Sequence, residues 1–86
     1  MKPREIRKVV AKPKLVTGWL AVDGNPGDGG NPIAFFVTPK PFKEQDGCWR
    51  SRWGHFGSWD KREWKAVYGK APLPKPGACE RVRLEL

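Results

Sequence analysis

One segment of this chain, residues 48–68, combines flat aromatic rings with positive charges. An aromatic ring can stack on the face of any unpaired base, and a lysine or arginine can hold a phosphate. The two residue types together are therefore typical of a nucleic-acid-binding surface, although a small domain also buries tryptophan simply to fill its core. The aromatic residues of the segment are Trp49, Trp53, Phe56, Trp59, Trp64 and Tyr68, and its cations include Arg50, Arg52, Lys61, Arg62 and Lys65.

The predicted contacts come from this segment and from the N-terminus. We expect at least two of the five tryptophans to lie in the core, namely Trp19 and Trp64, whereas nearby glycines favour exposure of Trp53 and Trp59. Residues 1–14 hold six lysines or arginines and one glutamate, so they are predicted to be a basic, flexible arm. The predicted nucleic-acid contacts are Arg50, Arg52, Trp53, Trp59, Lys61, Arg62, Lys2, Arg4, Arg7 and Lys8.

The net charge of +8 indicates an anionic partner. Nucleic acid is the first candidate, and a single strand of DNA or RNA is favoured over a duplex because the rings would stack on unpaired bases. An alternative is a non-catalytic interaction module, such as a small inhibitor or adaptor, that docks on an acidic protein. A third is a structural subunit of a larger assembly. A basic surface that only maintains solubility explains the same charge.

Residues that could support catalysis or bind a metal are too few to predict an enzyme. His55 is the only histidine, and with Cys48 and Cys79 it would supply three of the four ligands that a structural zinc needs. The glycine-rich loop at 23–32 lacks the Gly-Lys-Ser/Thr ending of a phosphate-binding loop and the twelfth-position glutamate of a calcium loop. We therefore expect no catalytic residue, no metal and no cofactor.

Hydropathy and cysteine content favour the cytoplasm. The charged N-terminus is not followed by the apolar stretch of a signal peptide, and no apolar run is long enough to span a bilayer. A membrane partner is accordingly not expected. In the reducing cytoplasm Cys48 and Cys79 are predicted to be free thiols.

Strand and helix patterns indicate how these residues are positioned. Strands are predicted over 15–22, 33–38, 48–56 and 80–86, the first two joined as a wide hairpin. Asp60 and Glu63 have the spacing of a capping box, so a helix is predicted over 60–68, with a strand as the alternative.

The expected domain organisation is a basic arm over 1–14 followed by one mainly β domain over 15–86, in the order β-β-β-α-β. Four short strands with one helix favour a strongly bent antiparallel sheet or a partly open barrel of SH3-like or OB-like kind. An α+β layer, with the helix across one face of the sheet, is the alternative.

Overall fold

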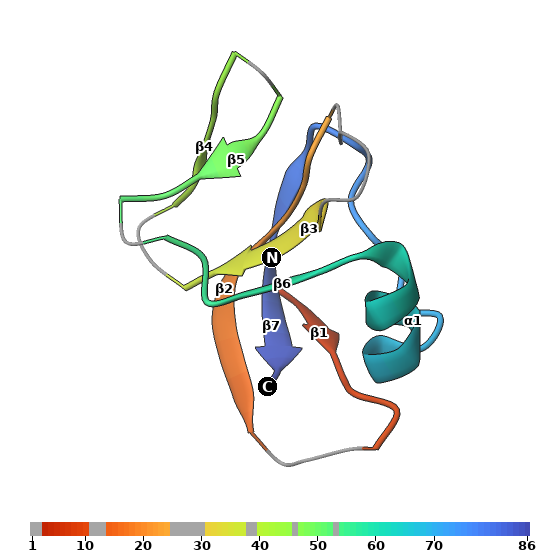
Figure 1. Cartoon of the computed structure of the whole chain (residues 1–86). Helices are drawn as coiled ribbons and strands as arrows, with labels where there is room; N and C mark the ends of the chain where they lie inside the picture. Colours follow the sequence, from red (N-terminus) through yellow and green to blue (C-terminus); the bar gives the residue numbers. More distant parts are fainter. Residues whose placement is uncertain (1–2, 11–13, 25–30, 38–39, 46, 53) are drawn as a thin grey trace.

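Seven strands and one helix make up the described part of the chain, which in this computed structural model comprises residues 3–10, 14–24, 31–37, 40–45, 47–52 and 54–86. The elements are β1 (Arg4–Ile6), β2 (Leu15–Val22), β3 (Ile33–Phe36), β4 (Phe42–Lys43), β5 (Trp49–Arg50), β6 (Gly57–Trp59), α1 (Lys61–Tyr68) and β7 (Cys79–Glu85). Five of the strands form a mixed sheet in the order β1-β7-β2-β3-β6, while β4 and β5 form a separate hairpin (Figure 1). The mainly β prediction is confirmed.

The three central strands of the sheet are antiparallel. β2 has the predicted range and pairs with β3, so the expected hairpin of these two strands is confirmed. On its other side β2 pairs with β7 from Leu15 opposite Glu85 to Ala21 opposite Cys79. Because successive side chains of a strand point to opposite faces, this register sorts the residues of the sheet into two faces.

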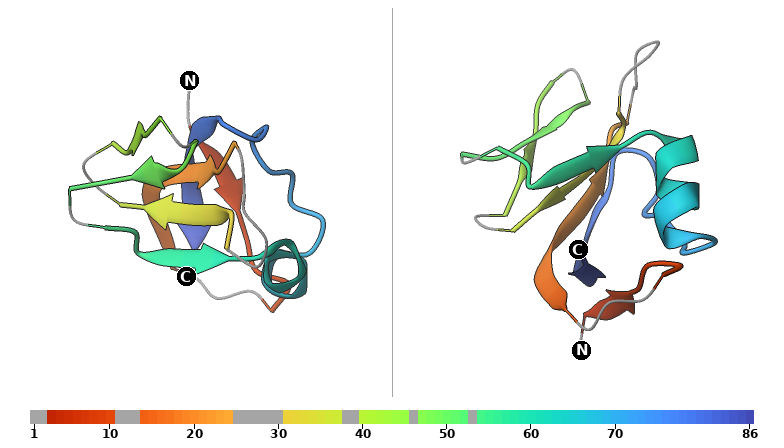
Figure 2. Two further views of the ribbon diagram at one scale, coloured as in Figure 1. Left: turned by 45° about the horizontal axis from the view of Figure 1, so that its top comes forward. Right: turned by 60° about the horizontal axis from the view of Figure 1, so that its bottom comes forward.

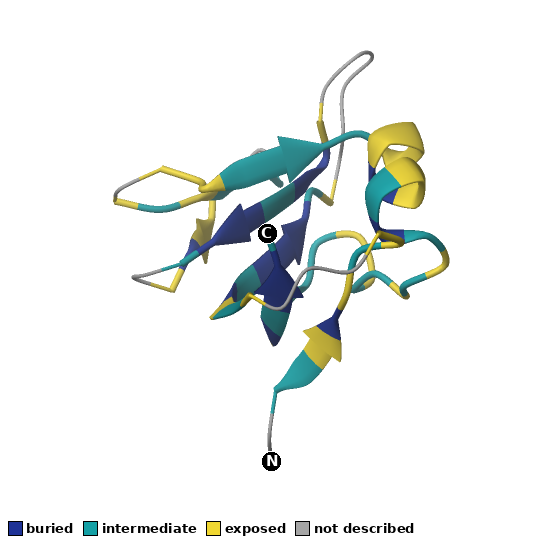
Figure 3. Cartoon of the chain, turned by 90° about the horizontal axis from the view of Figure 1, so that it is seen from below, coloured by how far each residue is buried: buried dark blue, intermediate teal, exposed yellow. Residues whose placement is uncertain are grey.

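One face of the sheet carries the main core and packs on α1. Trp64 and Tyr68 of the helix are buried against this face, and Figure 3 shows the buried positions concentrated in the central strands. Gly18 gives the Phe35 ring its room, since a Cβ at Gly18 would lie 2.5 Å from the ring carbon Cζ. The strand residues of this core are Ile6, Leu20, Val22, Ile33, Phe35, Val82 and Leu84.

The helix prediction is confirmed in its cap as well as its range. The Asp60 carboxylate accepts a hydrogen bond from the Glu63 backbone N–H at 2.7 Å, and the Asp60 N–H donates to the Glu63 carboxylate at 3.1 Å. This reciprocal pair satisfies backbone groups that the first turn would leave open. Gly69 ends the helix with a φ of 65°, a conformation that glycine adopts without steric cost. The alternative strand over these residues is wrong.

The predicted barrel is wrong, and so is the wholly antiparallel sheet. β1 runs parallel to β7, and the described strands do not close into a barrel, because β1 and β6 remain at opposite edges of the sheet. The helix lies between these two edges: β6 leads directly into α1, and Val9, which follows β1, donates a hydrogen bond to the Val67 carbonyl at 2.8 Å. The α+β layer weighed as an alternative describes this arrangement better.

Four other boundaries differ from the prediction. The strand expected over 48–56 is only Trp49–Arg50, because a turn closed by a hydrogen bond from Gly54 N–H to the Ser51 carbonyl (3.0 Å) follows it. Part of the expected arm belongs to the sheet, since Arg4–Ile6 forms β1 and Ile6 is 2% exposed. The strand expected over 33–38 is described to Phe36, and the last strand begins at Cys79 rather than at residue 80.

Candidate nucleic-acid interface

The β4–β5 hairpin is fastened to the end of β2 by Trp49. The Trp49 backbone N–H donates to the Asp23 carboxylate at 3.1 Å, and its indole N–H donates to the Val22 carbonyl at 3.0 Å. A turn with a hydrogen bond from Gly47 N–H to the Glu44 carbonyl (3.0 Å) reverses the chain. Figure 2 shows the hairpin and α1 on opposite sides of the sheet in both views.

A row of three side chains crosses the sheet on the face away from the main core. Trp19 on β2 is paired with Arg81 on β7 and with Phe36 on β3, so the three side chains are cross-strand neighbours on one face. The Lys40 ammonium lies over the Trp19 ring, 5.1 Å from its centre. The same cation opposes the rise that burial causes in the pKa of the Cys79 thiol, two residues before Arg81 in sequence.

A hollow of about 180 Å³ opens beside this row. Phe36, which is 2% exposed, lies at its base, and the exposed His55 ring meets the Phe36 ring edge-on with the centres 6.3 Å apart. Binding sites for drug-sized ligands usually measure ~300 Å³ or more, so this hollow suits a single flat ring. The residues that line it are Phe36, Trp49, Arg50, Ser51, Gly54 and His55.

Rings and cations thus alternate over one surface, which we call the hairpin face. The side chains of Lys40, Arg50, His55 and Arg81 are exposed there, whereas Trp19 and Trp49 are half-buried and held in place. Chemically, this surface offers ring faces or edges for stacking and several cations for anions at the rim. The residues of the hairpin face are Trp19, Phe36, Lys40, Trp49, Arg50, His55 and Arg81.

Two of the predicted contacts lie on the hairpin side. Arg50 lines the hollow, and its Nε atom is 3.6 Å from the Glu44 carboxylate in an exposed pair. Arg52 is exposed and follows β5 by two residues. Trp53, the predicted contact for which the sequence favoured an exposed ring, lies outside the described residues.

Three further predicted contacts lie at the helix. Trp59 meets Trp64 and Tyr68 edge-on, with ring centres 5.4 Å and 5.6 Å away, and is half-buried against the core. Lys61 and Arg62 are exposed in the first turn of α1. Since α1 and the hairpin lie on opposite sides of the sheet (Figure 2), the structure does not bring these residues together with Arg50.

The cations predicted in the arm are largely engaged within the protein. Arg4 forms a two-pronged pair with Glu80, at 2.8 and 3.0 Å, and this pair lowers the pKa of the Glu80 carboxyl. Arg7 lies 3.1 Å from the Glu5 carboxylate and 3.6 Å from that of Glu85. The Lys8 backbone N–H donates to the Glu85 carboxylate at 2.8 Å, and Lys2 lies outside the described residues.

Sequence reasoning missed most of the hairpin face. Trp19 was assigned to the core, but it is half-buried and faces away from the main cluster, whereas Trp64 is buried at 3% exposure as expected. The strand 15–22 is apolar almost throughout, which hides the face that each side chain occupies. Arg81 was the one signal of this face in the sequence, because the alternation of polar and apolar residues along the last strand places its side chain outward. In the structure it is exposed between two buried or half-buried neighbours.

No metal centre or membrane helix is found in the part of the chain that the structure describes. Groups of three or more metal-binding side chains do not gather there, and none of its helices has the length and apolar character needed to cross a bilayer. Cys48 and Cys79 are not joined in a disulfide. Comparison with protein-family models, with curated proteins and with solved structures gave no match, so no relative supports or limits a function for the hairpin face.

Proposed function

We propose that the protein binds single-stranded DNA or RNA on the hairpin face. The observation that carries this proposal is the row of Arg81, Trp19 and Phe36 across three strands, with Lys40 over the indole and the hollow alongside. A sheet face that presents an accessible ring among cations is a common platform for single strands, and here that ring is the half-buried Trp19.

In the absence of nucleic acid, Lys40 covers the Trp19 ring that a base would need. A cation–π contact at an exposed site contributes about 0.5–1 kcal/mol, whereas stacking one base on an aromatic side chain contributes about 1–3 kcal/mol. The base therefore displaces the ammonium, and the displaced cation remains close enough to hold the adjacent phosphate. Lys40 would cover the Trp19 ring in the free protein and hold a phosphate of the nucleic-acid backbone in the complex.

Phosphate contacts are assigned to the hairpin side rather than to the arm. Arg4 and Arg7 would have to leave carboxylate partners, two of them for Arg7, before they could hold a phosphate. Arg50 lies 3.6 Å from the exposed Glu44 carboxylate, and an exposed pair of this kind is worth only about 0–1 kcal/mol. The cations assigned to phosphates are Lys40, Arg50, Arg52 and Arg81.

The geometry favours a single strand over a duplex. Ring faces and a hollow of about 180 Å³ can be reached only by bases that are unpaired and turned outward. A duplex offers its phosphates to the same cations but hides its base faces. Duplex binding should therefore be weaker and more sensitive to salt than single-strand binding.

Fluorescence anisotropy with end-labelled oligonucleotides tests this function. A 12-nucleotide thymidine strand, a 12-nucleotide uridine strand and a 12-base-pair duplex are each titrated with the full chain in about 50 and 200 mM salt. We expect both single strands to bind more tightly than the duplex. Equal affinity for all three, or no binding in the lower salt, would contradict the proposal.

A further inference from the structure

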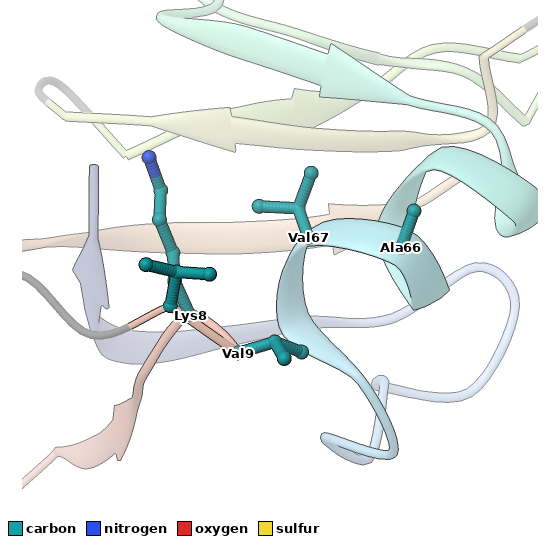
Figure 4. A pocket seen from close by; sticks show the side chains of 5 residues that line it. Lys8, Val9, Ala66 and Val67 are labelled. Atoms are coloured by element: carbon teal, nitrogen blue, oxygen red, sulfur yellow. The ribbon is translucent and has the colours of Figure 1, made fainter.

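A second surface lies on the other side of the molecule, where the chain after β1 meets α1. Val9 donates its backbone N–H to the Val67 carbonyl at 2.8 Å, and this bond ties the two walls of a groove together. The groove encloses about 290 Å³ and is lined by Lys8, Val9, Val10, Ala66 and Val67. Figure 4 shows Ala66 and Val67 on the helix and Lys8 and Val9 on the chain after β1, with the Lys8 side chain extending along the opening between them.

The groove exposes apolar side chains that have no cover within the described residues. Val9 is 65% and Val10 is 77% exposed. Both line the same groove as Val67, a half-buried valine of the helix. A single exposed valine needs no explanation, but a concave group of small apolar side chains is typical of a place where another molecule inserts a side chain.

Positive charge surrounds the groove. Lys8 is part of its wall, and Arg62 lies one helical turn before Ala66, so the two residues share a face of α1. Lys70 is exposed just beyond Gly69, which ends the helix. The acid in the first turn, Glu63, directs its carboxylate to the Asp60 N–H at the N-terminal end of the helix.

We infer that this groove, the helix groove, binds a segment of an acidic protein that inserts one apolar side chain between flanking aspartates or glutamates. The apolar floor fits the inserted side chain, and Lys8, Arg62 and Lys70 complement the carboxylates. A lipid surface fits less well, because its binding normally uses protruding Trp, Phe or Leu side chains. Here the lining is valine and alanine around a hollow.

This inference does not rest on nucleic-acid binding. The helix groove is formed by α1 and the chain after β1, whereas the hairpin face is on the opposite side of the sheet (Figure 2). The two surfaces share no lining residue. If both are used, the protein links a nucleic acid to an acidic protein, and each function can be lost by substitution without loss of the other.

Selection from a displayed library of random 12-residue peptides tests the helix groove. The full chain is the bait, and chains with Val10→Glu and Val10→Ile are screened in parallel. We expect enriched peptides to carry one Leu, Ile or Phe between acidic residues. Their affinity should fall at least tenfold with Val10→Glu, which adds a like charge to an exposed position, and should persist with Val10→Ile.

The controls separate this surface from the hairpin face and from other occupants. Arg81→Gln should leave peptide affinity unchanged, and Val10→Glu should leave oligonucleotide affinity unchanged. Enriched peptides without acidic residues, or peptides indifferent to Val10→Glu, would overturn the inference. So would a Val10-dependent dimer in sedimentation, or Val10-dependent binding to phosphatidylserine vesicles in the absence of any selected peptide.

Discussion

The Lys40 ammonium lies 5.1 Å from the centre of the Trp19 ring, on the face of the sheet that does not pack on the helix. Trp19 is consequently neither a core residue nor an open platform, since the Lys40 cation covers its ring face. Replacement of that cation by a base is the step on which the proposed function depends, and several measurements can test it.

Removal of the Trp19 ring should weaken single-strand binding. Trp19→Ala is expected to reduce affinity for the 12-nucleotide strands by about 5- to 150-fold, which corresponds to the loss of ~1–3 kcal/mol of stacking. Trp19→Phe keeps a ring and should lose much less. Anisotropy gives the affinities, and thermal unfolding establishes that each variant is folded. Unchanged affinity in a folded Trp19→Ala chain would show that no base stacks there.

Removal of positive charge should reduce the salt dependence of single-strand binding on the hairpin face but not at α1. Lys40→Gln combined with Arg81→Gln should lower the slope of log affinity against log salt by about 1.4, because each phosphate contact to a single strand contributes about 0.7. Lys61→Gln combined with Arg62→Gln is the matched control, with the same charge change at α1. If the helix pair lowered the slope and the hairpin-face pair did not, the strand would follow the original prediction from the sequence.

Gly18 should tolerate no side chain, because a Cβ there would lie 2.5 Å from the Phe35 ring and 2.6 Å from the Phe36 carbonyl oxygen. The backbone atom cannot move aside as a flexible side chain could. Gly18→Ala is therefore expected to lower the free energy of unfolding by about 3 kcal/mol, at the upper end for overpacked sites. Thr17→Ala, at the exposed neighbouring position, should change it by less than ~0.5 kcal/mol. Urea unfolding of both variants makes the comparison, and a similar midpoint for the two would contradict the close approach.

Tyr68 should control stability at high pH. Burial and then the Glu85 charge raise the pKa of its phenol from 10.0 to about 12, and its O–H donates to the Glu85 carbonyl at 2.8 Å. The folded state therefore favours the protonated phenol: its contribution is complete below pH 10.0 and is lost as the pH rises towards 12.

Tyr68→Phe isolates that contribution from the titration of the lysines. At neutral pH the variant should be less stable by about 1–2 kcal/mol, since a buried carbonyl loses its donor. Between pH 10 and 12 its unfolding free energy should fall less steeply than that of the parent chain. Parallel curves for the two proteins across this interval would contradict the raised pKa.

Local signals in the sequence were sufficient for the elements that depend on neighbours along the chain. Asp60 and Glu63 specify the helix cap three residues apart, and the apolar, β-branched pattern of 15–22 specifies β2. The parallel pairing of Arg4–Ile6 with β7 joins chain ends more than seventy residues apart. No local pattern encodes such a pairing, and a short basic segment read alone is typical of an arm.

The residues of the proposed site could be predicted only in part from the sequence. Aromatic and cationic composition indicated the chemistry, and Arg50 does line the hollow. Trp59 illustrates why the other positions could not be predicted: flanking glycine and serine suggested exposure, but the ring packs against Trp64 and Tyr68. Which face a tryptophan occupies depends on strand register and on the position of α1, and both are tertiary properties.

Indole N–H signals in a ¹⁵N-labelled chain give the most direct test of the hairpin face. Single Trp→Phe variants assign the signals, and the tighter-binding 12-nucleotide strand is then added. We expect the Trp19 and Trp49 indole signals to shift, while that of Trp64, which is buried and donates to the Ala71 carbonyl at 3.2 Å, stays in place. Binding that leaves the Trp19 and Trp49 signals unmoved would contradict the account, because the strand would then lie elsewhere on the protein.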